Sequence, residues 1–147
     1  MFQKKYFLEG LAVFAVLLFS TQVFAQVEQR QDLMKGQSAA SKAIKGAVEA
    51  KDFAAIEAKA KDLMGSSEKI VGAFPKGSDK GKTKATPAIW EKSDDFAKAA
   101  KTLGTAASAL VSAAKAKDEA AVTASVKGVS NACGGCHKAF RAEKYAE

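Results

Sequence analysis

The chain has 147 residues, with 23 lysines and arginines against 16 aspartates and glutamates, so its formal net charge is +7 with the single histidine neutral. Hydrophobic residues make up 48% of the sequence and charged residues only 27%, which excludes a disordered chain. The length predicts one domain rather than several.

Residues 1–25 have the features of a secretory signal peptide. Lys4 and Lys5 form a basic start, residues 11–19 are an unbroken apolar run, and Val23 and Ala25 are the small residues that signal peptidase reads. The alternative is an uncleaved membrane anchor, but the run is far shorter than the roughly 20 residues that a transmembrane helix needs. We therefore expect cleavage after Ala25, export to the periplasm, and a mature domain of residues 26–147.

The mature domain has an unusual composition. Its 122 residues carry a net charge of +6, include 28 alanines and contain only six aromatic residues. Small side chains let helices pack closely, but they leave little bulk to fill a core. A bulky apolar cofactor would supply that volume, and we expect the chain to be poorly folded without it.

Apolar residues recur at steps of three and four in four segments, and no convincing period-two alternation occurs. The four segments are residues 27–48, 53–74, 90–114 and 122–140. Asp52 and Asp118 each precede an apolar run, as N-cap residues do. Residues 75–87 contain two prolines, two glycines and five charges, which indicates a surface crossover. The pattern predicts an all-α, antiparallel up-down four-helix bundle, with a looser helical array as the alternative.

The chemistry is concentrated in Cys133-Gly134-Gly135-Cys136-His137, which holds both cysteines and the only histidine. Residues at i and i+3 share a helix face, so Cys133 and Cys136 can each add across one vinyl group of a haem. The adjacent His137 can then serve as an axial ligand of the iron. This pattern is the attachment signal for one covalent haem c.

Other roles for the two cysteines account less well for the motif. A structural disulfide leaves the neighbouring histidine without a role. A thioredoxin-like redox pair needs a βαβ context that the sequence does not show. A zinc site normally needs four ligands, and the motif supplies three.

The second axial position of the iron is open to several ligands. Because His137 is the only histidine, two-histidine ligation within one chain is impossible, which leaves methionine, lysine, a small molecule or no ligand. Lysine must first lose a proton, which is unfavourable near neutral pH. Met34 lies on the inward row of the first segment, whereas Met64 lies beside the inward Leu63. Met34 is therefore the better candidate, and ordinary core packing is its alternative role.

The C-terminal run at residues 133–141, together with Arg30-Gln31-Asp32-Leu33-Met34-Lys35 and Pro87-Ala88-Ile89-Trp90, resembles the class II c-type cytochromes. These are the cytochrome c-prime proteins and their low-spin relatives. The resemblance implies a left-handed four-helix bundle, with Cys133 and Cys136 as thioether attachments and His137 as the proximal ligand.

The resemblance also implies roles for residues outside the motif. Arg30, and more weakly Gln31, match residues near the haem propionates, and Arg141 matches a basic residue near the proximal histidine. The alternative for both arginines is a solvated surface. Low-spin members bind iron through methionine at the position of Met34, whereas cytochrome c-prime members keep an open site for nitric oxide or carbon monoxide.

These observations predict a periplasmic mono-haem one-electron carrier with His137 and Met34 as axial ligands. The first alternative is a five-coordinate protein that binds nitric oxide or carbon monoxide, and the second is a haem-free helical binding module with a local disulfide. No nucleophile–base pair or substrate motif predicts an enzyme.

The positive charge of the chain is relevant to its binding partners. Outward helical positions hold a set of lysines: Lys35, Lys42, Lys45, Lys51, Lys59 and Lys61. These can steer acidic redox partners or attract an anionic membrane surface, or they can simply form a solvated face. Nucleic acid is not expected for an exported chain without a recognition motif. A homodimer is expected from the resemblance alone.

Overall fold

The computed structural model describes residues 3–79 and 82–143, with side chains from residue 26 onward. Its helices are α1 (Gln3–Glu49), α2 (Phe53–Ser67), α3 (Ala88–Glu91), α4 (Ser93–Ala116) and α5 (Glu119–Phe140), with a 3₁₀ turn η1 (Val71–Ala73). In the part of the chain that is described, the only β-type pairing is one isolated antiparallel bridge between Ala85 and Arg141.

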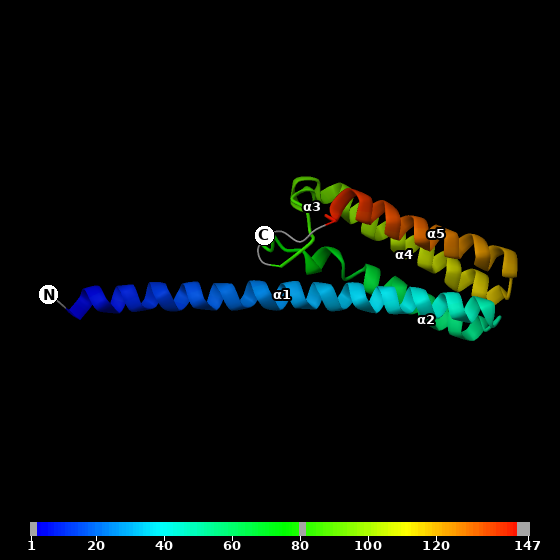
Figure 1. Ribbon diagram of the computed structural model, residues 1–147, viewed down its shortest axis with the longest axis horizontal. Coiled ribbons are helices and arrows are strands. Elements are labelled where there is room, and N and C mark those ends of the chain that lie inside the picture. Colours follow the sequence, from blue (N-terminus) through cyan, green and yellow to red (C-terminus); the bar gives the residue numbers. More distant parts are fainter. Residues whose placement is uncertain (1–2, 80–81, 144–147) are drawn as a thin grey trace.

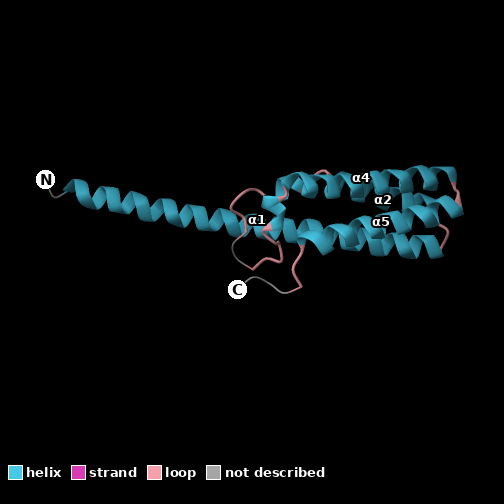
Figure 2. Cartoon of the chain, turned by 90° about the horizontal axis from the view of Figure 1, so that it is seen from above, coloured by secondary structure: helices cyan, strands magenta, loops and turns pink. Residues whose placement is uncertain are grey.

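The four long helices form an antiparallel bundle. Helices α1, α2, α4 and α5 run in alternating directions, and each packs against the next in the chain (Figure 1). The two short turns lie at one end of the bundle, and the long crossover and the last described residues lie at the other (Figures 1 and 2). The predicted all-α up-down four-helix bundle is confirmed.

Helix α1 runs well beyond the bundle. It spans 47 residues, or about 70 Å at 1.5 Å per residue, and its first half projects past the other helices (Figure 2). The predicted signal peptide falls on residues whose side chains lie outside the described part, so cleavage after Ala25 stays a prediction. Among the residues with described side chains, no helix combines the length and apolar character that a membrane crossing requires.

The two short turns have the same construction, as their similar sequences predict. Asp52 and Asp118 cap α2 and α5, because their carboxylates accept hydrogen bonds from the backbone N–H groups of Ala55 and Ala121, each at 2.9 Å. The residue before each cap is a lysine in the left-handed region, with φ of 53° at both Lys51 and Lys117. One such residue ends each preceding helix and reverses the chain.

The predicted segment boundaries near the crossover are wrong in two places. Helix α2 ends at Ser67, so Phe74 lies beyond it, after η1. Trp90 belongs to the one-turn helix α3, because Lys92 leaves the helical conformation (φ −121°, ψ 52°) before α4 begins. The indole N–H of Trp90 donates to the carbonyls of Phe74 and Pro75, at 3.1 and 3.0 Å, and this contact fixes α3 against the end of the preceding turn.

Small side chains let α2 and α4 pack closely, which leaves the opposite side of the bundle open. Ala60 and Ala107 are fully buried among larger residues such as Leu63 and Leu110. A Cβ atom added at Gly104 would lie 2.7 Å from the Ser67 Oγ, so a larger residue here would force the Ser67 side chain to move. Helices α1 and α5 pack against α2 and α4, respectively, and face each other across the remaining space.

We expect Asp118→Ala to lower the free energy of unfolding by about 1 kcal/mol, because the first turn of α5 loses its side-chain cap. Urea denaturation of the haem-bound protein measures this change. Asp118→Asn is the matched control, since the amide oxygen can still accept the N–H of Ala121. Equal losses in the two variants would contradict the capping explanation.

Candidate functional site

A cavity of about 620 Å³ lies between α1, α4, α5 and the crossover, within the range of roughly 300–1,000 Å³ that is typical of cofactor sites. Residues that line it include the apolar set Ile70, Phe74, Ala85, Ile89, Phe96, Ala99, Ala100, Leu103, Ala132 and Phe140. Every site residue named from the sequence also lines it: Arg30, Gln31, Met34, Cys133, Cys136, His137 and Arg141. The fold therefore brings together two chain segments that are about a hundred residues apart.

The last turns of α5 place both cysteines on one wall of the cavity. Cys133 and Cys136 are free thiols and half-buried. Burial raises the pKa of both thiols, and the neighbouring Cys133 raises the pKa of Cys136 further. Both groups are therefore neutral thiols near pH 7, without the lowered pKa that is typical of a thiol–disulfide redox pair.

His137 follows on the same helix end. Although the residue is exposed, desolvation at the cavity wall lowers the pKa of its imidazole, and the positive charge of Arg141 lowers it further. The neutral form therefore predominates near neutral pH and offers a lone pair to a metal. Arg141 also donates its backbone N–H to the carbonyl of His137 at 3.0 Å, and it lies near this histidine as the resemblance implies.

Arg30 is buried, so the solvated surface proposed as its alternative is wrong for this residue. Its side chain is only 4% exposed, and its guanidinium donates to the carbonyl of Ser78 at 3.1 Å and to the hydroxyl of Thr83 at 3.3 Å. The guanidinium carbon lies 4.6 Å from the centre of the Phe74 ring. Burial lowers the pKa of Arg30, but an arginine keeps its charge in a protein. A buried cation that donates to the neutral groups of Ser78 and Thr83 therefore lies at the cavity wall.

The crossover closes the end of the cavity instead of lying free on the surface. Ser78 and Thr83 are buried against Arg30, and Gln31 donates to the carbonyl of Lys82 at 3.2 Å. Backbone N–H groups of Thr86 and Ala142 donate across to the carbonyls of Phe140 and Lys84, at 3.1 and 2.8 Å. These contacts join the crossover to the end of α5, next to the cysteine–histidine motif.

Sequence reasoning missed the aromatic wall of the cavity. Three of the four phenylalanines in residues 26–147 meet there, with Phe96 in edge-to-face contact with both Phe74 and Phe140 at centroid distances of 5.0 and 5.2 Å. The sequence pattern could have predicted this cluster. An up-down bundle brings the end of the second segment, the start of the third and the end of the fourth to the same level.

The two methionines with described side chains lie in different places. Met34 is half-buried and lines the cavity from α1, across from the motif on α5. Met64 lies in a separate surface groove between α2 and α4. Only Met34 is therefore available to a group held in the cavity.

These residues fit a haem. Two thiols and an imidazole occupy one wall, a thioether lies on the opposite helix, and aromatic and aliphatic side chains supply the dry surface that a porphyrin needs. The fold and the site define a helical-bundle protein with a covalently bound haem.

Comparisons with known proteins identify the family. The family model described as Cytochrome C' matches residues 25–141, and the chain belongs to this family, whose members carry covalently attached haem c. The haem-free binding module is thereby overturned. Cytochrome c-556 of Agrobacterium fabrum is 36% identical over 122 residues, covering 81% of this chain and 82% of the relative.

Solved structures of similar proteins support the same family. Cytochrome c' of Thermochromatium tepidum superposes with a TM-score of 0.75 at 30% identity, covering 81% of this chain and 95% of that one. A variant of cytochrome c' from Alcaligenes xylosoxidans, solved as a nitric oxide complex, has a TM-score of 0.74 at 26% identity and covers 83% and 97%. Relatives also include a cytochrome c' with ligand-controlled dimer dissociation.

We expect Arg30→Lys to lower the free energy of unfolding by about 1–3 kcal/mol, because an ammonium group cannot reach Ser78 and Thr83 together while covering Phe74. Urea denaturation of the haem-bound protein provides the measurement. Gln31→Ala is the control, with a loss below about 0.5 kcal/mol, since it removes one exposed hydrogen bond. A similar loss in both variants would argue against Arg30 as the anchor of the crossover.

Proposed function

We propose that the protein is a periplasmic one-electron carrier in which Cys133 and Cys136 attach the haem and His137 and Met34 are its axial ligands. The observation that supports this proposal best is the position of Met34 on the cavity wall across from the cysteine–histidine motif. Thioether ligation is part of the known chemistry of c-type haems, and it raises the reduction potential.

The protein's own residues would prepare the site for electron transfer. The neutral imidazole of His137 would bind the iron from α5, and the half-buried Met34 would bind it from α1. The aromatic wall excludes water from the buried side of the cavity. The buried charge of Arg30 would balance a haem propionate, with Gln31 beside it. When bound, the haem supplies the one-electron chemistry itself.

We also propose that the protein is exported and that it is not an enzyme. The family match begins at residue 25, where the predicted signal peptide ends, which supports a mature domain of residues 26–147 in the periplasm. The cysteines, the histidine and the apolar wall of the cavity suit haem binding, and we propose a carrier and not an enzyme. A homodimer is proposed only because relatives include dimers.

The second candidate function is gas binding at a five-coordinate haem. It is favoured by a relative of the same fold that was solved with nitric oxide, and the open cavity beside Met34 would admit nitric oxide or carbon monoxide. In this case Met34 would pack in the core without binding the iron.

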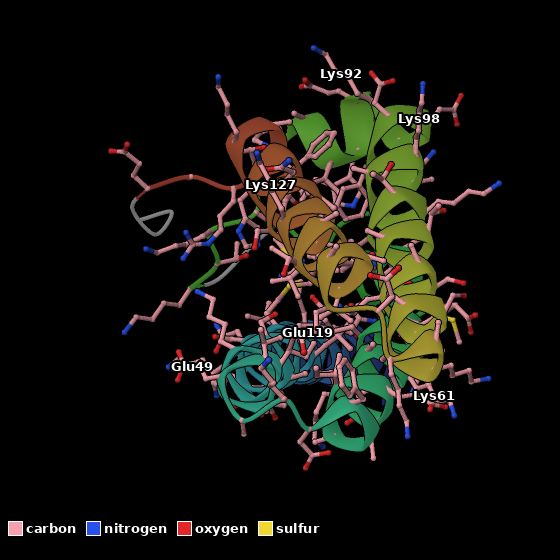
Figure 3. The ribbon with its side chains drawn as sticks, turned by 90° about the vertical axis from the view of Figure 1, so that its right-hand side faces the viewer. Glu49, Lys61, Lys92, Lys98, Glu119 and Lys127 are labelled. Atoms are coloured by element: carbon pink, nitrogen blue, oxygen red, sulfur yellow. The ribbon has the colours of Figure 1, made fainter. Side chains whose placement is uncertain are left out.

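The cavity rim favours acidic redox partners. Arg30, Lys35, Lys84 and Arg141 line the cavity, and no aspartate or glutamate is among the described residues that do so. Other lysines, such as Lys61, Lys92 and Lys98, extend outward around the bundle (Figure 3). A concentration of positive charge at the place where electrons enter would steer anionic partners toward the haem.

We expect the ferric protein to show the sharp absorption spectrum of low-spin haem, and Met34→Ala to convert it to the broad high-spin form. The reason is that the variant removes the sixth ligand. Met64→Ala is the matched control and should leave the spectrum unchanged, since Met64 lies outside the cavity. A high-spin spectrum of the unaltered protein would exclude Met34 ligation and support the gas-binding function.

We expect oxidation of the ferrous haem by ferricyanide, a small anionic acceptor, to slow as ionic strength rises, because salt screens the basic rim. Lys35→Gln should slow the reaction severalfold at low salt. Lys59→Gln is a matched control, because both lysines form an exposed i,i+3 ion pair with an aspartate but Lys59 does not line the cavity. Stopped-flow absorbance measures both rates, and a rate independent of salt would refute steering.

A further inference from the structure

Gln37 is a buried polar residue on the wall that α1 contributes to the cavity. It lies one helical turn after Met34 on the inward row of α1, where the neighbouring inward residues further along the helix are Ala40 and Ile44. Its side chain is only 9% exposed, and it lines the cavity. Burial of an amide costs free energy unless its polar atoms find partners. The partner of each end of the Gln37 amide therefore shows what the residue does in the site.

Hydrogen bonds fix which end of this amide faces the cavity. The Gln37 Nε2 donates to the Ser66 Oγ at 3.1 Å, and the Ser66 Oγ donates to the carbonyl of Leu63 at 2.9 Å. Because the single hydroxyl proton of Ser66 is used in this second bond, Ser66 can only accept from Gln37. The nitrogen of the amide therefore points to α2.

The carbonyl oxygen points the other way. No described residue donates a hydrogen bond to this oxygen. Because it is not one of the fully buried unpaired atoms of the described residues, part of its surface is accessible. The accessible space that Gln37 lines is the cavity. Because Ser66 on the neighbouring helix holds the amide nitrogen, the negative end of the amide dipole is left to the cavity that Gln37 lines.

We infer that Gln37, oriented by Ser66, lowers the reduction potential of the haem. A fixed partial negative charge in a water-poor cavity stabilises the more positive ferric iron over the ferrous iron. This inference rests on the proposed haem site, and it concerns the level of the potential rather than the identity of the axial ligand. Gln37 touches the haem pocket, and Ser66 acts through Gln37 as a positioning residue.

The test is a spectroelectrochemical titration of the haem-bound protein. Gln37→Leu should shift the ferric:ferrous ratio at a fixed electrode potential about five-fold toward ferrous, the factor expected for one ordinary polar contact. Ser66→Ala should shift it in the same direction, because the amide loses its anchor. The double variant should match Gln37→Leu alone, since both changes act through one group.

Two further variants distinguish an effect on the reduction potential from an effect on the stability of the fold. Ser66→Thr keeps the accepting hydroxyl and should keep the original potential. Ser67→Ala is the matched control, because this serine makes the same bond to the carbonyl three residues before it, at 2.7 Å to Met64, but faces Gly104 on α4. The potential should not change in this variant.

The inference fails if Gln37→Leu and Ser66→Ala lower the free energy of unfolding but leave the potential unchanged, for Gln37 would then only tie α1 to α2. If Gln37→Leu does not fold, the Ser66→Ala and Ser66→Thr pair still decides the question without altering the cavity wall. Absence of the haem Soret band from the unaltered protein would instead refute the proposed function.

Discussion

The rest of the structure depends on the space between α1 and α5. Helices α2 and α4 pack closely through alanines and Gly104, whereas Met34 and the polar side chains of α1 lie across a cavity from the cysteine–histidine motif of α5. Phenylalanine, isoleucine and leucine side chains of the core line this cavity, and a planar apolar group bound there would fill it and complete the packing. The haem c of this family is therefore part of the core as well as its reactive centre.

The two ends of the bundle have different roles. At one end, two capped turns of similar sequence reverse the chain with little additional structure. At the other end, the crossover, η1, α3 and the last residues of α5 meet around the cavity. Arg30 joins these parts, because one buried guanidinium contacts the crossover and the aromatic wall together. The residues of the predicted haem site therefore lie at the second end.

Two buried polar side chains of α1 lie beside the cavity. Arg30 and Gln37 are both on the inward row of α1, one turn before and one turn after Met34. Each is held by hydroxyl or carbonyl groups of another segment, which restricts its orientation. Helix α1 thus presents to the site a cation, a thioether and a carbonyl dipole in succession, and the balance of these groups would set the electronic environment of the iron.

Sequence alone determined the bundle, the caps at Asp52 and Asp118 and the haem motif at Cys133, Cys136 and His137, because helical periodicity, capping and i,i+3 spacing act over a few residues. It also favoured Met34 over Met64, since one heptad row points inward. Tertiary structure decided the end of α2 at Ser67, the separation of Trp90 from α4, the burial of Arg30 and the meeting of Phe74, Phe96 and Phe140. These features depend on contacts between residues far apart in the chain, such as Trp90 with Phe74 and Gln37 with Ser66, and no local pattern encodes which segments will meet.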